Sequence, residues 1–475
     1  LGEVPRGDKQ DVELAYQAAA KAQPAWAALA PSKRADYLRA LDDAMEKRGE
    51  EALHVEVLDT GNTIAKMRFD LGSGCETLRF YAGIAYEMKG QTIPASTGNL
   101  HLTVREPYGV VGRIIPFNHP LMFSIAKMAA PLMAGNTVIV KPSEQSPLSA
   151  SILAEECARV LPPGIVNIVT GLGAEAGDAI VRHPKIKRLA FTGSAKTGMA
   201  IQKAAAEVAV KVFSLELGGK SPVVLGRSAD LAVAAARIMN GKTLNAGQIC
   251  LAPDYVLAPQ DHVGDFVELA KSTVRAMFPT IRDNPDYTAV VSDRHFSRLK
   301  GYLDDARAKG AEIVEINPAD EELRQSPHRI IAPTLVLNPS DDMKVMQDEI
   351  FGPILPIKGY RSLDDAIDYI NAHARPLGLY YFGTDATERD RLLGRTTSGG
   401  VTVNDVIMHV AQENLPFGGI GPAGMGAYHG HDGFREFSHR KSVFHQVTKD
   451  LGPLRMFRPP YGKGLAKYLD RQISR

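Results

Sequence analysis

Short apolar, β-branched runs alternate with longer helical stretches through the middle of the chain. The runs predict strands at 137–140, 166–169, 189–192 and 222–225, with helices between them at 149–160, 174–182 and 195–210. Parallel strands need long crossover connections, which are usually helices that cover the sheet. The pattern therefore predicts an α/β domain with a doubly wound parallel sheet, an architecture that commonly binds nucleotides.

Two flanking regions show other patterns. Ala-rich helical periodicity at 11–22 and 32–47 predicts packing helices, which Pro24 and Pro31 should separate. After residue 250 a second α/β segment is expected, which we interpret as a domain of its own. Its predicted helices are 263–277, 293–309 and 363–372, and its predicted strands are 330–337, 353–358 and 400–403.

One segment between the helical regions is expected to be extended. Residues 89–106 include an apolar and polar alternation at 101–104, which is typical of a strand. Together with the basic tail after Phe434, this segment could form an arm that pairs with another subunit. A simple surface hairpin explains the same pattern.

Length and charge narrow the class of protein. A chain of 475 residues exceeds what one hydrophobic core supports, so two or three domains are expected. Its 55 basic and 54 acidic residues nearly cancel, which argues against nucleic acid or an anionic membrane and favours a small-molecule partner. The sequence opens with no export leader and contains no run suited to a spanning helix. We expect a cytoplasmic protein.

The cysteines and paired histidines give little support for structural bridges or metals. Cys75, Cys157 and Cys250 are too few and too far apart for a disulfide framework or a zinc site, which indicates a reducing compartment. His429 and His431 lie two residues apart without a nearby Cys or carboxylate. No metal site is predicted.

A carboxylate and a thiol stand out because each is expected in a Gly-flanked turn. Glu216 precedes Leu217-Gly218-Gly219, and Cys250 follows Gly247-Gln248-Ile249. A thiolate can add to a carbonyl carbon, and a carboxylate can then activate water to release the acyl group. Alone, the cysteine reads equally as a buried small hydrophobe and the glutamate as a solvated charge.

Three loops are candidates for binding a dinucleotide. Gly171 to Gly177 follows a predicted strand, but its spacing is GxGxxxG, so an ordinary strand-to-helix turn explains it as well. Gly193-Ser194 opens a predicted helix and suits a pyrophosphate, although a Ser N-cap gives the same sequence. Lys141 to Glu144 follows a strand, where the two charged groups could hold ribose hydroxyls; a solvated turn is the alternative. A carboxylate there repels a 2′-phosphate, so Glu144 favours NAD over NADP.

With these segments in hand, the chain resembles the aldehyde dehydrogenase superfamily from about Val4 to its end. Its C-terminal third is similar to class 3 members, and residues 245–257 and 458–462 are similar to coniferyl aldehyde dehydrogenases. The N-terminal half is closer to the bacterial class 1/2 type. Seven ordered motifs carry the resemblance: Pro116-Phe117-Asn118, Lys141 to Glu144, Phe191 to Gly198, Glu216 to Lys220, Gly247 to Cys250, Glu349 to Pro353, and Pro416 to Gly419.

The resemblance implies a fold in three parts. A Rossmann-like NAD-binding domain is expected at 1–88 and 107–217, an α/β catalytic domain at 218–417, and a small β oligomerisation arm with the C-terminal tail at 89–106 and 433–475. A homodimer or homotetramer is expected.

The resemblance also implies the site. Cys250 is the expected nucleophile, Glu216 the general base and Asn118 the oxyanion donor. NAD is the expected cofactor, with NADP possible. Its predicted contacts are Ile115, Pro116, Lys141, Ser143, Glu144, Gly173, Gly193, Ser194, Leu217, Glu349 and Phe351.

Two positions next to Asn118 depart from the family pattern. Phe117 replaces the usual Trp and keeps an aromatic wall. His119 is less usual; it could shape the pocket, but a packed, hydrogen-bonded histidine is the favoured interpretation.

The expected reaction is oxidation of an aldehyde to its acid through a thiohemiacetal and a thioester on Cys250. Phe123, Ile249, Leu251 and His409 are predicted to line an apolar tunnel that favours an aromatic or medium-chain aldehyde, although core packing explains them too. A CoA-acylating enzyme would not need the base Glu216. A catalytically inert binding or structural protein would not need the complete set of Cys250, Glu216, Asn118 and Glu349. A cofactor-free thiol hydrolase would leave the cofactor motifs unused.

Overall fold

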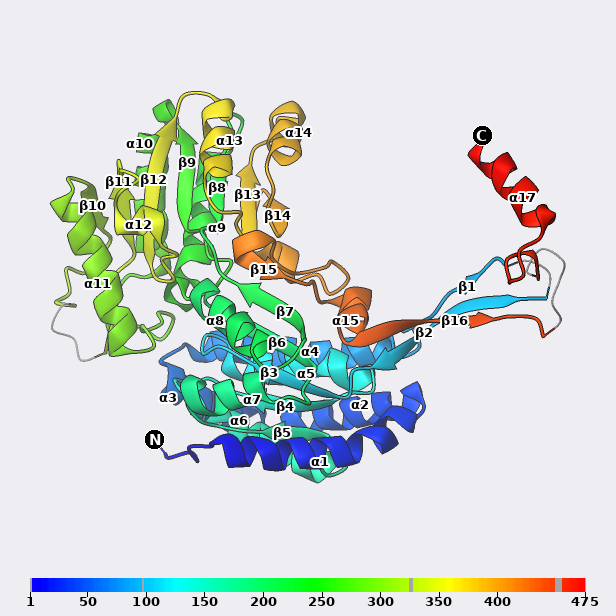
Figure 1. Ribbon diagram of the computed structural model, residues 1–475. Helices are drawn as coiled ribbons and strands as arrows, with labels where there is room; N and C mark the ends of the chain where they lie inside the picture. The colour runs from blue at the N-terminus through cyan, green and yellow to red at the C-terminus, as the bar shows by residue number, and fades with distance from the viewer. Residues whose placement is uncertain (1, 96–97, 324–327, 449–454, 475) are drawn as a thin grey trace. The chain divides into compact units, whose positions relative to one another are not determined.

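The computed structural model describes residues 2–95, 98–323, 328–448 and 455–474 (Figure 1). The chain forms two compact units. The larger comprises Leu1–Glu87 and Pro107–Ser438, and the smaller comprises Met88–Glu106 and His439–Arg475.

The chain begins with four helices: α1 (Lys9–Ala28), α2 (Pro31–Lys47), α3 (Gly49–Thr60) and α4 (Ile64–Gly83). The predicted helix break at Pro24 is wrong, because Pro24 lies inside α1. A proline this close to a helix end removes a single backbone bond, and its φ is already helical. Burial of the next turn compensates: Trp26 is 1% exposed and donates from Nε1 to the Leu132 carbonyl at 2.9 Å.

Within the described residues, the first sheet of the larger unit has six strands in the order β15-β7-β6-β3-β4-β5. All neighbours are parallel except β15 with β7. Helices α5 and α6 connect β3 to β4 and β4 to β5, and a π-helical turn, α7 and α8 connect the later strands. The bounds are β3 (Val110–Ile114), α5 (Pro120–Met133), β4 (Thr137–Lys141), α6 (Ser149–Val160), β5 (Val166–Ile168), the π-helical turn (Gly173–Gly177), α7 (Asp178–Arg182), β6 (Arg188–Gly193), α8 (Ala195–Ala206), β7 (Val212–Leu217) and β15 (Gly424–Met425).

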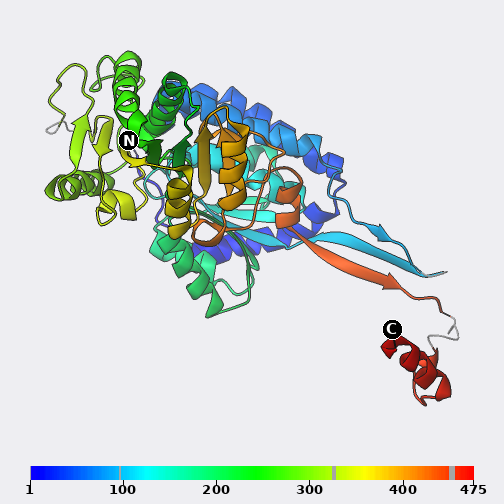
Figure 2. The same cartoon turned by 90° about the horizontal axis from the view of Figure 1, so that it is seen from above.

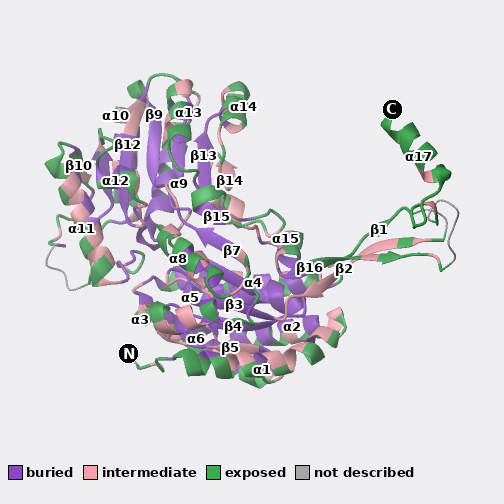
Figure 3. Ribbon diagram, viewed as in Figure 1, coloured by how far each residue is buried: buried purple, intermediate pink, exposed green. Residues whose placement is uncertain are grey.

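The direction of the connections reverses at β3, whose neighbours β4 and β6 are reached by separate crossovers. Right-handed crossovers then place α5 and α6 on one face and α7 and α8 on the other. The core on the α7 and α8 side also takes in α1, through Val12 and Ala19. The strands appear as the buried centre of this sheet in Figure 3. Such a reversal leaves a crevice at the carboxyl ends of the strands, where ligands of open α/β sheets bind.

The second sheet of the larger unit has seven strands among the described residues, in the order β10-β11-β12-β9-β8-β13-β14. Only β10 runs antiparallel to its neighbour. One face packs on α9 and α10, and the other on α11, α13 and α14; Figure 2 shows α13 and α14 lying over the strands. The bounds are β8 (Pro222–Leu225), α9 (Leu231–Thr243), β9 (Tyr255–Pro259), α10 (Val263–Met277), α11 (Asp293–Ala308), β10 (Glu312–Glu315), β11 (Thr334–Leu337), α12 (Lys344–Gln347), β12 (Ile354–Tyr360), α13 (Leu363–Ala372), β13 (Gly378–Phe382), α14 (Ala386–Arg395), β14 (Gly400–Val403) and α15 (Gly430–Glu436).

The smaller unit contains a three-stranded sheet in the order β1-β2-β16, and helix α17 (Lys463–Ile473). Its strands are β1 (Thr92–Ile93), β2 (Leu100–Pro107) and β16 (Ser438–His445), and β1 pairs antiparallel with β2. The predicted α/β class with parallel sheets is confirmed. The assignment of domains and the role of the arm remain predictions. In the part of the chain that the structure describes, every helix is too short or too polar to cross a membrane.

Candidate active site

The loop that carries Cys250 has an unusual backbone. Asn245, Ala246 and Gly247 are all left-handed, with φ of 53°, 49° and 71°. A left-handed conformation costs a non-glycine residue roughly 1–2 kcal/mol. At Gly247 a side chain has no room, because an added Cβ would lie 2.3 Å from the carbonyl oxygen of Gly352. Tertiary contacts must therefore hold this loop.

Asn245 provides those contacts. Its Nδ2 donates to the carbonyl of Asn118 at 2.9 Å, and its Oδ1 accepts from Asn62 at 2.7 Å. Gln248 adds bonds from its side chain to Ala289 and Val291. The buried amides thus tie the cysteine loop to the segment that carries Asn118.

Cys250 and Glu216 face each other across the two sheets of the larger unit. The Cys250 Sγ lies 3.9 Å from Glu216 Oε1. Glu216 lies inside β7 and not in a turn as the sequence suggested, because its strand continues to Leu217. Its carboxylate is 4% exposed, whereas Cys250 is partly exposed. A buried carboxylate therefore lies beside a partly exposed cysteine.

Three polar side chains converge on the other oxygen of Glu216. Lys127 Nζ on α5 donates to Oε2 at 2.9 Å, Thr192 Oγ1 on β6 donates at 3.1 Å, and the Tyr428 hydroxyl also donates to Oε2. Lys127 lies over the Tyr428 ring, 3.3 Å from its centroid. These contacts leave Oε1 to face the thiol.

Burial shifts the protonation of this cluster towards neutral forms. It raises the pKa of Glu216 to about 8, against the opposing charge of Arg113. It lowers the pKa of Lys127 well below its ordinary value, with Arg113 acting in the same direction. Burial, then the charges of Glu216 and Glu349, raise the pKa of the Cys250 thiol. Glu216 can therefore exchange a proton near neutral pH, which general acid–base catalysis requires.

Asn118 lies at the end of the segment after β3, beside the cysteine loop. Its Nδ2 donates to the Gln248 carbonyl at 3.0 Å, and the residue is 4% exposed. An amide has a second hydrogen on Nδ2. That hydrogen is not used in the bond to Gln248, and its role as an oxyanion donor remains a prediction.

The predicted cofactor residues gather at the carboxyl edge of the first sheet. Ile115 and Pro116 follow β3, Lys141 ends β4, Gly193 ends β6 and Leu217 ends β7. Parallel strands bring these ends to one edge, at the reversal of strand order. The fold thus brings these residues to one edge of the sheet, and their roles remain predictions.

Several features of that edge suit a dinucleotide. Lys141 is 2% exposed and its Nζ donates to Glu144 Oε2 at 3.0 Å, so an ammonium and a half-exposed carboxylate lie side by side, a set that suits the hydroxyls of a ribose. Gly193 has no room for a side chain, because a Cβ would lie 2.5 Å from the Phe191 ring. Bare backbone there, at the start of α8, suits close approach of a pyrophosphate.

Other predicted cofactor residues show plain structural uses. Ser194 caps α8, since its hydroxyl accepts from the Thr197 N–H at 3.2 Å. Ser143 caps a turn by accepting from Gln145 N–H at 3.2 Å. Gly173 begins the π-helical turn after β5, with open space around it. The loop at Gly193-Ser194 is therefore a helix cap, and the loop at Gly171 to Gly177 is a strand-to-helix turn, as the alternative interpretations of the sequence described them.

Glu349 lies against the glycines that follow Glu216. A Cβ on Gly218 would lie 2.0 Å from Glu349 Oε2, so the carboxylate occupies space that only glycine leaves. Burial, and then the charge of Asp254, raise the pKa of Glu349 to about 8. Phe351 follows with φ of 48° and meets Phe117 edge-on at 5.8 Å.

Aromatic contacts join the predicted substrate residues. Phe123 lies 4.9 Å from Lys127 Nζ, and Phe417 lies 5.8 Å from Tyr428 and 5.9 Å from His409. Ile249, Leu251 and Phe417 belong to one buried cluster that Cys250 adjoins. Phe123, Tyr428, Phe417 and His409 thus form a chain of ring contacts through Lys127. The contacts agree with an apolar wall near the thiol and also with core packing.

Lys127, Tyr428 and Thr192 were not predicted from the sequence. The one local signal for Lys127 is its charge in an otherwise apolar helix, Pro120–Met133. Tyr428 carries no such signal, because it reaches Glu216 from a distant part of the chain. Among the described residues, no group of His, Cys, Asp and Glu could hold a metal.

Comparisons with known proteins agree with this geometry. The family model described as the aldehyde dehydrogenase family matches residues 1–443. A probable coniferyl aldehyde dehydrogenase of Caulobacter vibrioides is 59% identical over 390 residues, covering 82% of this chain and 80% of the relative. The coniferyl aldehyde dehydrogenase of a Pseudomonas species is 51% identical over 369 residues, covering 78% of this chain and 76% of the relative.

Solved structures show the same fold. The crystal structure of an NAD-dependent aldehyde dehydrogenase from Sinorhizobium meliloti superposes with a TM-score of 0.88 at 30% identity, covering 94% of this chain and 89% of that one. Sequence and fold agree over nearly the same residues. The chain belongs to the aldehyde dehydrogenase family.

Proposed function

We propose that this protein oxidises aromatic aldehydes to carboxylic acids with NAD, through a covalent thioester on Cys250 that water hydrolyses with the help of Glu216. Its family makes it an aldehyde dehydrogenase that works on a small aldehyde with a nicotinamide cofactor. The finer mechanism is supported above all by one observation. A buried carboxylate whose pKa is raised to about 8 lies 3.9 Å from the only partly exposed cysteine among the described thiols.

The first step is addition of the Cys250 thiol to the aldehyde carbon. Because burial raises the pKa of the thiol, its proton must leave to water as the sulfur attacks, which keeps Glu216 free to act in the later hydrolysis. The resulting thiohemiacetal carries its oxygen beside Asn118 Nδ2. Loss of an oxyanion donor of this kind costs about 10²–10³ in rate.

A nicotinamide cofactor, whose ring side Glu349 and Phe351 would hold, would supply the hydride acceptor that turns the thiohemiacetal into a thioester. The chain's own residues then determine the fate of the acyl group. Glu216 takes a proton from water, the hydroxide adds to the thioester, and the carboxylic acid leaves as Cys250 regains its proton. Lys127 and Tyr428 keep the Glu216 carboxylate aimed at this point.

NAD is the proposed cofactor in preference to NADP. Glu144 is half-exposed beside Lys141 at the edge of β4, where its charge repels a 2′-phosphate. Lys141, Ser143, Glu144, Gly173, Gly193 and Ser194 are assigned to the adenosine and phosphate side, and Ile115, Pro116, Leu217, Glu349 and Phe351 to the nicotinamide side.

An aromatic substrate is proposed because of the ring contacts and the named relatives. Phe123, Ile249, Leu251 and His409 are assigned to the wall that receives it. A phenylpropanoid aldehyde fits both the aromatic wall and the coniferyl aldehyde dehydrogenases among the relatives. The remaining proposals concern the whole protein: residues 1–88 and 107–217 bind the cofactor, 218–417 carry the nucleophile, and 89–106 and 433–475 mediate assembly of a cytoplasmic homodimer or homotetramer.

The test is to follow NADH formation with NAD or NADP over coniferyl, benzyl, aliphatic and carboxylated aldehydes. The comparison includes the wild type, Cys250→Ala and Glu216→Gln. Cys250→Ala should lose turnover with every aldehyde, and turnover by this variant contradicts covalent catalysis. Glu216→Gln should form a burst of NADH and then stop.

The CoA-acylating alternative is tested in the same assay. Added CoA should leave the wild-type rate unchanged, because Glu216 already activates water. Acceleration by CoA, with an acyl-CoA as the product, supports the alternative. If the wild type reduces neither cofactor with any of the aldehydes, the result supports the interpretation that the protein is a catalytically inert binding protein.

A further inference from the structure

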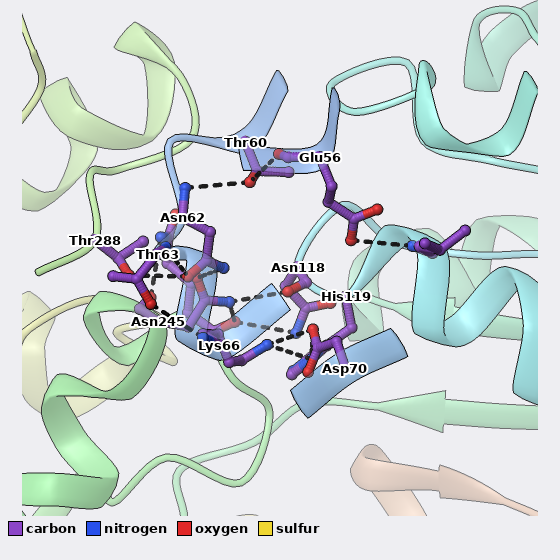
Figure 4. A network of polar contacts seen from close by, with 12 residues as sticks. Glu56, Thr60, Asn62, Thr63, Lys66, Asp70, Asn118, His119, Asn245 and Thr288 are labelled. Carbon is purple, nitrogen blue, oxygen red and sulfur yellow. Dashed lines mark hydrogen bonds and ion pairs between the residues drawn. The ribbon is translucent and has the colours of Figure 1, made fainter. Parts of the chain in front are cut away.

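A second buried cluster lies behind Asn118. Lys66 and Asp70 lie one turn apart on α4, and both reach His119, the residue after Asn118 (Figure 4). Lys66 Nζ and Asp70 Oδ2 each lie 3.0 Å from His119 Nδ1, and Lys66 also pairs directly with Asp70. His119 is 8% exposed and Asp70 is 1% exposed. The expected packed, hydrogen-bonded histidine is therefore present, but it has two charged partners on one nitrogen.

His119 faces the predicted substrate side with its ring. It lies 5.2 Å from Phe123, centroid to centroid. Nδ1 is turned towards α4, so Nε2 is the nitrogen left for another partner. In the described part of the chain, Nε2 has no hydrogen bond and is not among the fully buried polar atoms. Nε2 therefore keeps some contact with solvent.

The protonation of His119 follows from its neighbours. Burial lowers the pKa of His119, and the charge of Lys66, with that of Lys127 on α5, lowers it further while Asp70 opposes. Although burial works against its charge, the pKa of Asp70 is held below the ordinary value by His119 and Lys66. A neutral imidazole beside a Lys66–Asp70 ion pair is the resulting state at neutral pH.

The tautomer follows from counting donors. Lys66 has three N–H donors, and its partners among the described residues are Asp70 and His119. If His119 Nδ1 carried the proton, two of the lysine donors would be buried without acceptors. If Nδ1 is bare, it accepts from Lys66 and one lysine donor remains, while Asp70 Oδ2, 3.0 Å from Nδ1, is held by the Lys66 ammonium that both groups share. Unpaired buried donors are costly, so the second arrangement is favoured.

We propose that Lys66 and Asp70 are positioning residues that fix His119 as the tautomer with hydrogen on Nε2, and that this N–H is a specificity determinant which donates to an oxygen on the aldehyde. The proposal rests on the proposed function, because the aldehyde must bind beside Asn118 and Phe123. It adds one donor to a wall that is otherwise aromatic. Aldehydes that carry an ether or hydroxyl oxygen within its reach are then preferred to the bare hydrocarbon.

The tautomer itself is measured without turnover. Long-range ¹H–¹⁵N correlation spectra of ¹⁵N-histidine protein, with His119 assigned by its loss in His119→Phe, should show hydrogen on Nε2 in the wild type. In Lys66→Met, Asp70 becomes the sole partner of Nδ1, so the hydrogen should move to Nδ1. Lys66→Arg should restore the wild-type pattern. Hydrogen on Nδ1 in the wild type, or no change in Lys66→Met, overturns the positioning role.

Specificity is measured by kcat/KM for benzaldehyde and its 2-, 3- and 4-methoxy derivatives. A neutral hydrogen bond accounts for roughly 2- to 10-fold in binding. His119→Phe keeps the ring beside Phe123, so at least one methoxy isomer should lose roughly that factor relative to benzaldehyde. Lys66→Met should lose the same preference, and Lys66→Arg should keep it. Equal losses for all four aldehydes overturn the specificity role.

A pH profile separates this cluster from a purely structural role. Without Lys66, the charge of Asp70 raises the pKa of His119, so KM for the preferred isomer in Lys66→Met should change with pH near neutrality while the wild-type KM stays flat. Failure of the proposed function is distinct, because it removes NADH formation with every aldehyde and leaves the tautomer signal unchanged. Thermal melts of the variants establish that they are folded.

Discussion

Two buried clusters, one around Glu216 and one around His119, each contain a lysine and a carboxylate, but in different arrangements. In the first, Lys127, Tyr428 and Thr192 all bind one oxygen of Glu216, and the carboxylate turns its other oxygen to Cys250. In the second, the carboxylate of Asp70 pairs with Lys66, and both contact Nδ1 of His119. Under the proposals above, the carboxylate is the base in the first cluster, whereas in the second the lysine and the carboxylate position the histidine.

The largest effect that tests this contrast is expected at Glu216. Glu216→Gln keeps the shape but removes the base, and general base catalysis contributes about 10²–10⁴ in rate. We expect steady-state turnover to fall by about that factor while a burst of NADH of one equivalent per site remains. Rapid-mixing absorbance at 340 nm measures both phases. If Glu216→Gln loses both the burst and turnover, Glu216 also acts in acylation. If turnover is unchanged, Glu216 has no part in the reaction.

The same substitution in each cluster gives the sharpest contrast. Lys127→Met removes a donor to the Glu216 carboxylate, which must be charged to act as the base, and a hydrogen bond to a charged group contributes about 1.5–3 kcal/mol. We expect kcat to fall roughly 10- to 100-fold for every aldehyde. Lys66→Met, its matched control, should change the preference among aldehydes with little effect on kcat for benzaldehyde. Equal falls in kcat for both variants contradict the division of roles.

The pH dependence of hydrolysis tests the state of Glu216. Its pKa is raised to about 8, and the base acts only when it has lost its proton, so kcat limited by hydrolysis should rise with pH through about 8. Tyr428→Phe removes a donor that favours the charged carboxylate. The rising limb should therefore move to higher pH, with roughly a tenfold loss of kcat at pH 7. If the rising part of the pH profile does not move in Tyr428→Phe, it reports the titration of a group other than Glu216.

Glu56 provides a third carboxyl near the His119 cluster and affects stability alone. It is 1% exposed, its Oε1 accepts from the Leu121 N–H at 3.2 Å, and burial raises its pKa to about 7. The unfolded chain ionises Glu56 at lower pH than the folded chain does, so stability falls as pH rises from about 4.5 to 7 and stays reduced above that range. Glu56→Gln mimics the protonated acid and removes this penalty.

The expected gain for Glu56→Gln is about 3 kcal/mol at pH 8 and near zero at pH 4, since one pKa unit corresponds to about 1.4 kcal/mol. Urea unfolding at the two pH values measures it. Aldehyde oxidation at pH 8 should be unchanged. A stability gain of the same size at both pH values contradicts the titration and points to packing.

Buried parallel strands were the most predictable part of the fold. The runs at 137–140 and 222–225 are apolar except for Thr137, because helices cover both faces of their sheets. The strand Val212–Leu217 was not predicted, since Ser214 and Glu216 interrupt its apolar pattern. Pro24 was misread because local propensity does not report the burial of Trp26, two residues further on.

The site was predictable only where a motif lies in one stretch of chain. Glu216, Cys250 and Asn118 stand in recognisable segments, and the structure brings the first two within contact distance. Lys127, Tyr428, Lys66 and Asp70 act through side chains that meet in space from separate elements. Nothing in the spacing of Tyr428 from Glu216 along the sequence indicates that they touch, so contacts of this kind are found only in the three-dimensional structure.

The left-handed run at Asn245, Ala246 and Gly247 has a consequence for how the enzyme ages. Cys250, the proposed nucleophile, follows a backbone conformation that a few buried amides hold in place, and small local openings should release it long before the sheets separate. Warming should therefore abolish activity at temperatures where circular dichroism still reports full secondary structure. Loss of activity in a stored sample should therefore follow the opening of this one loop.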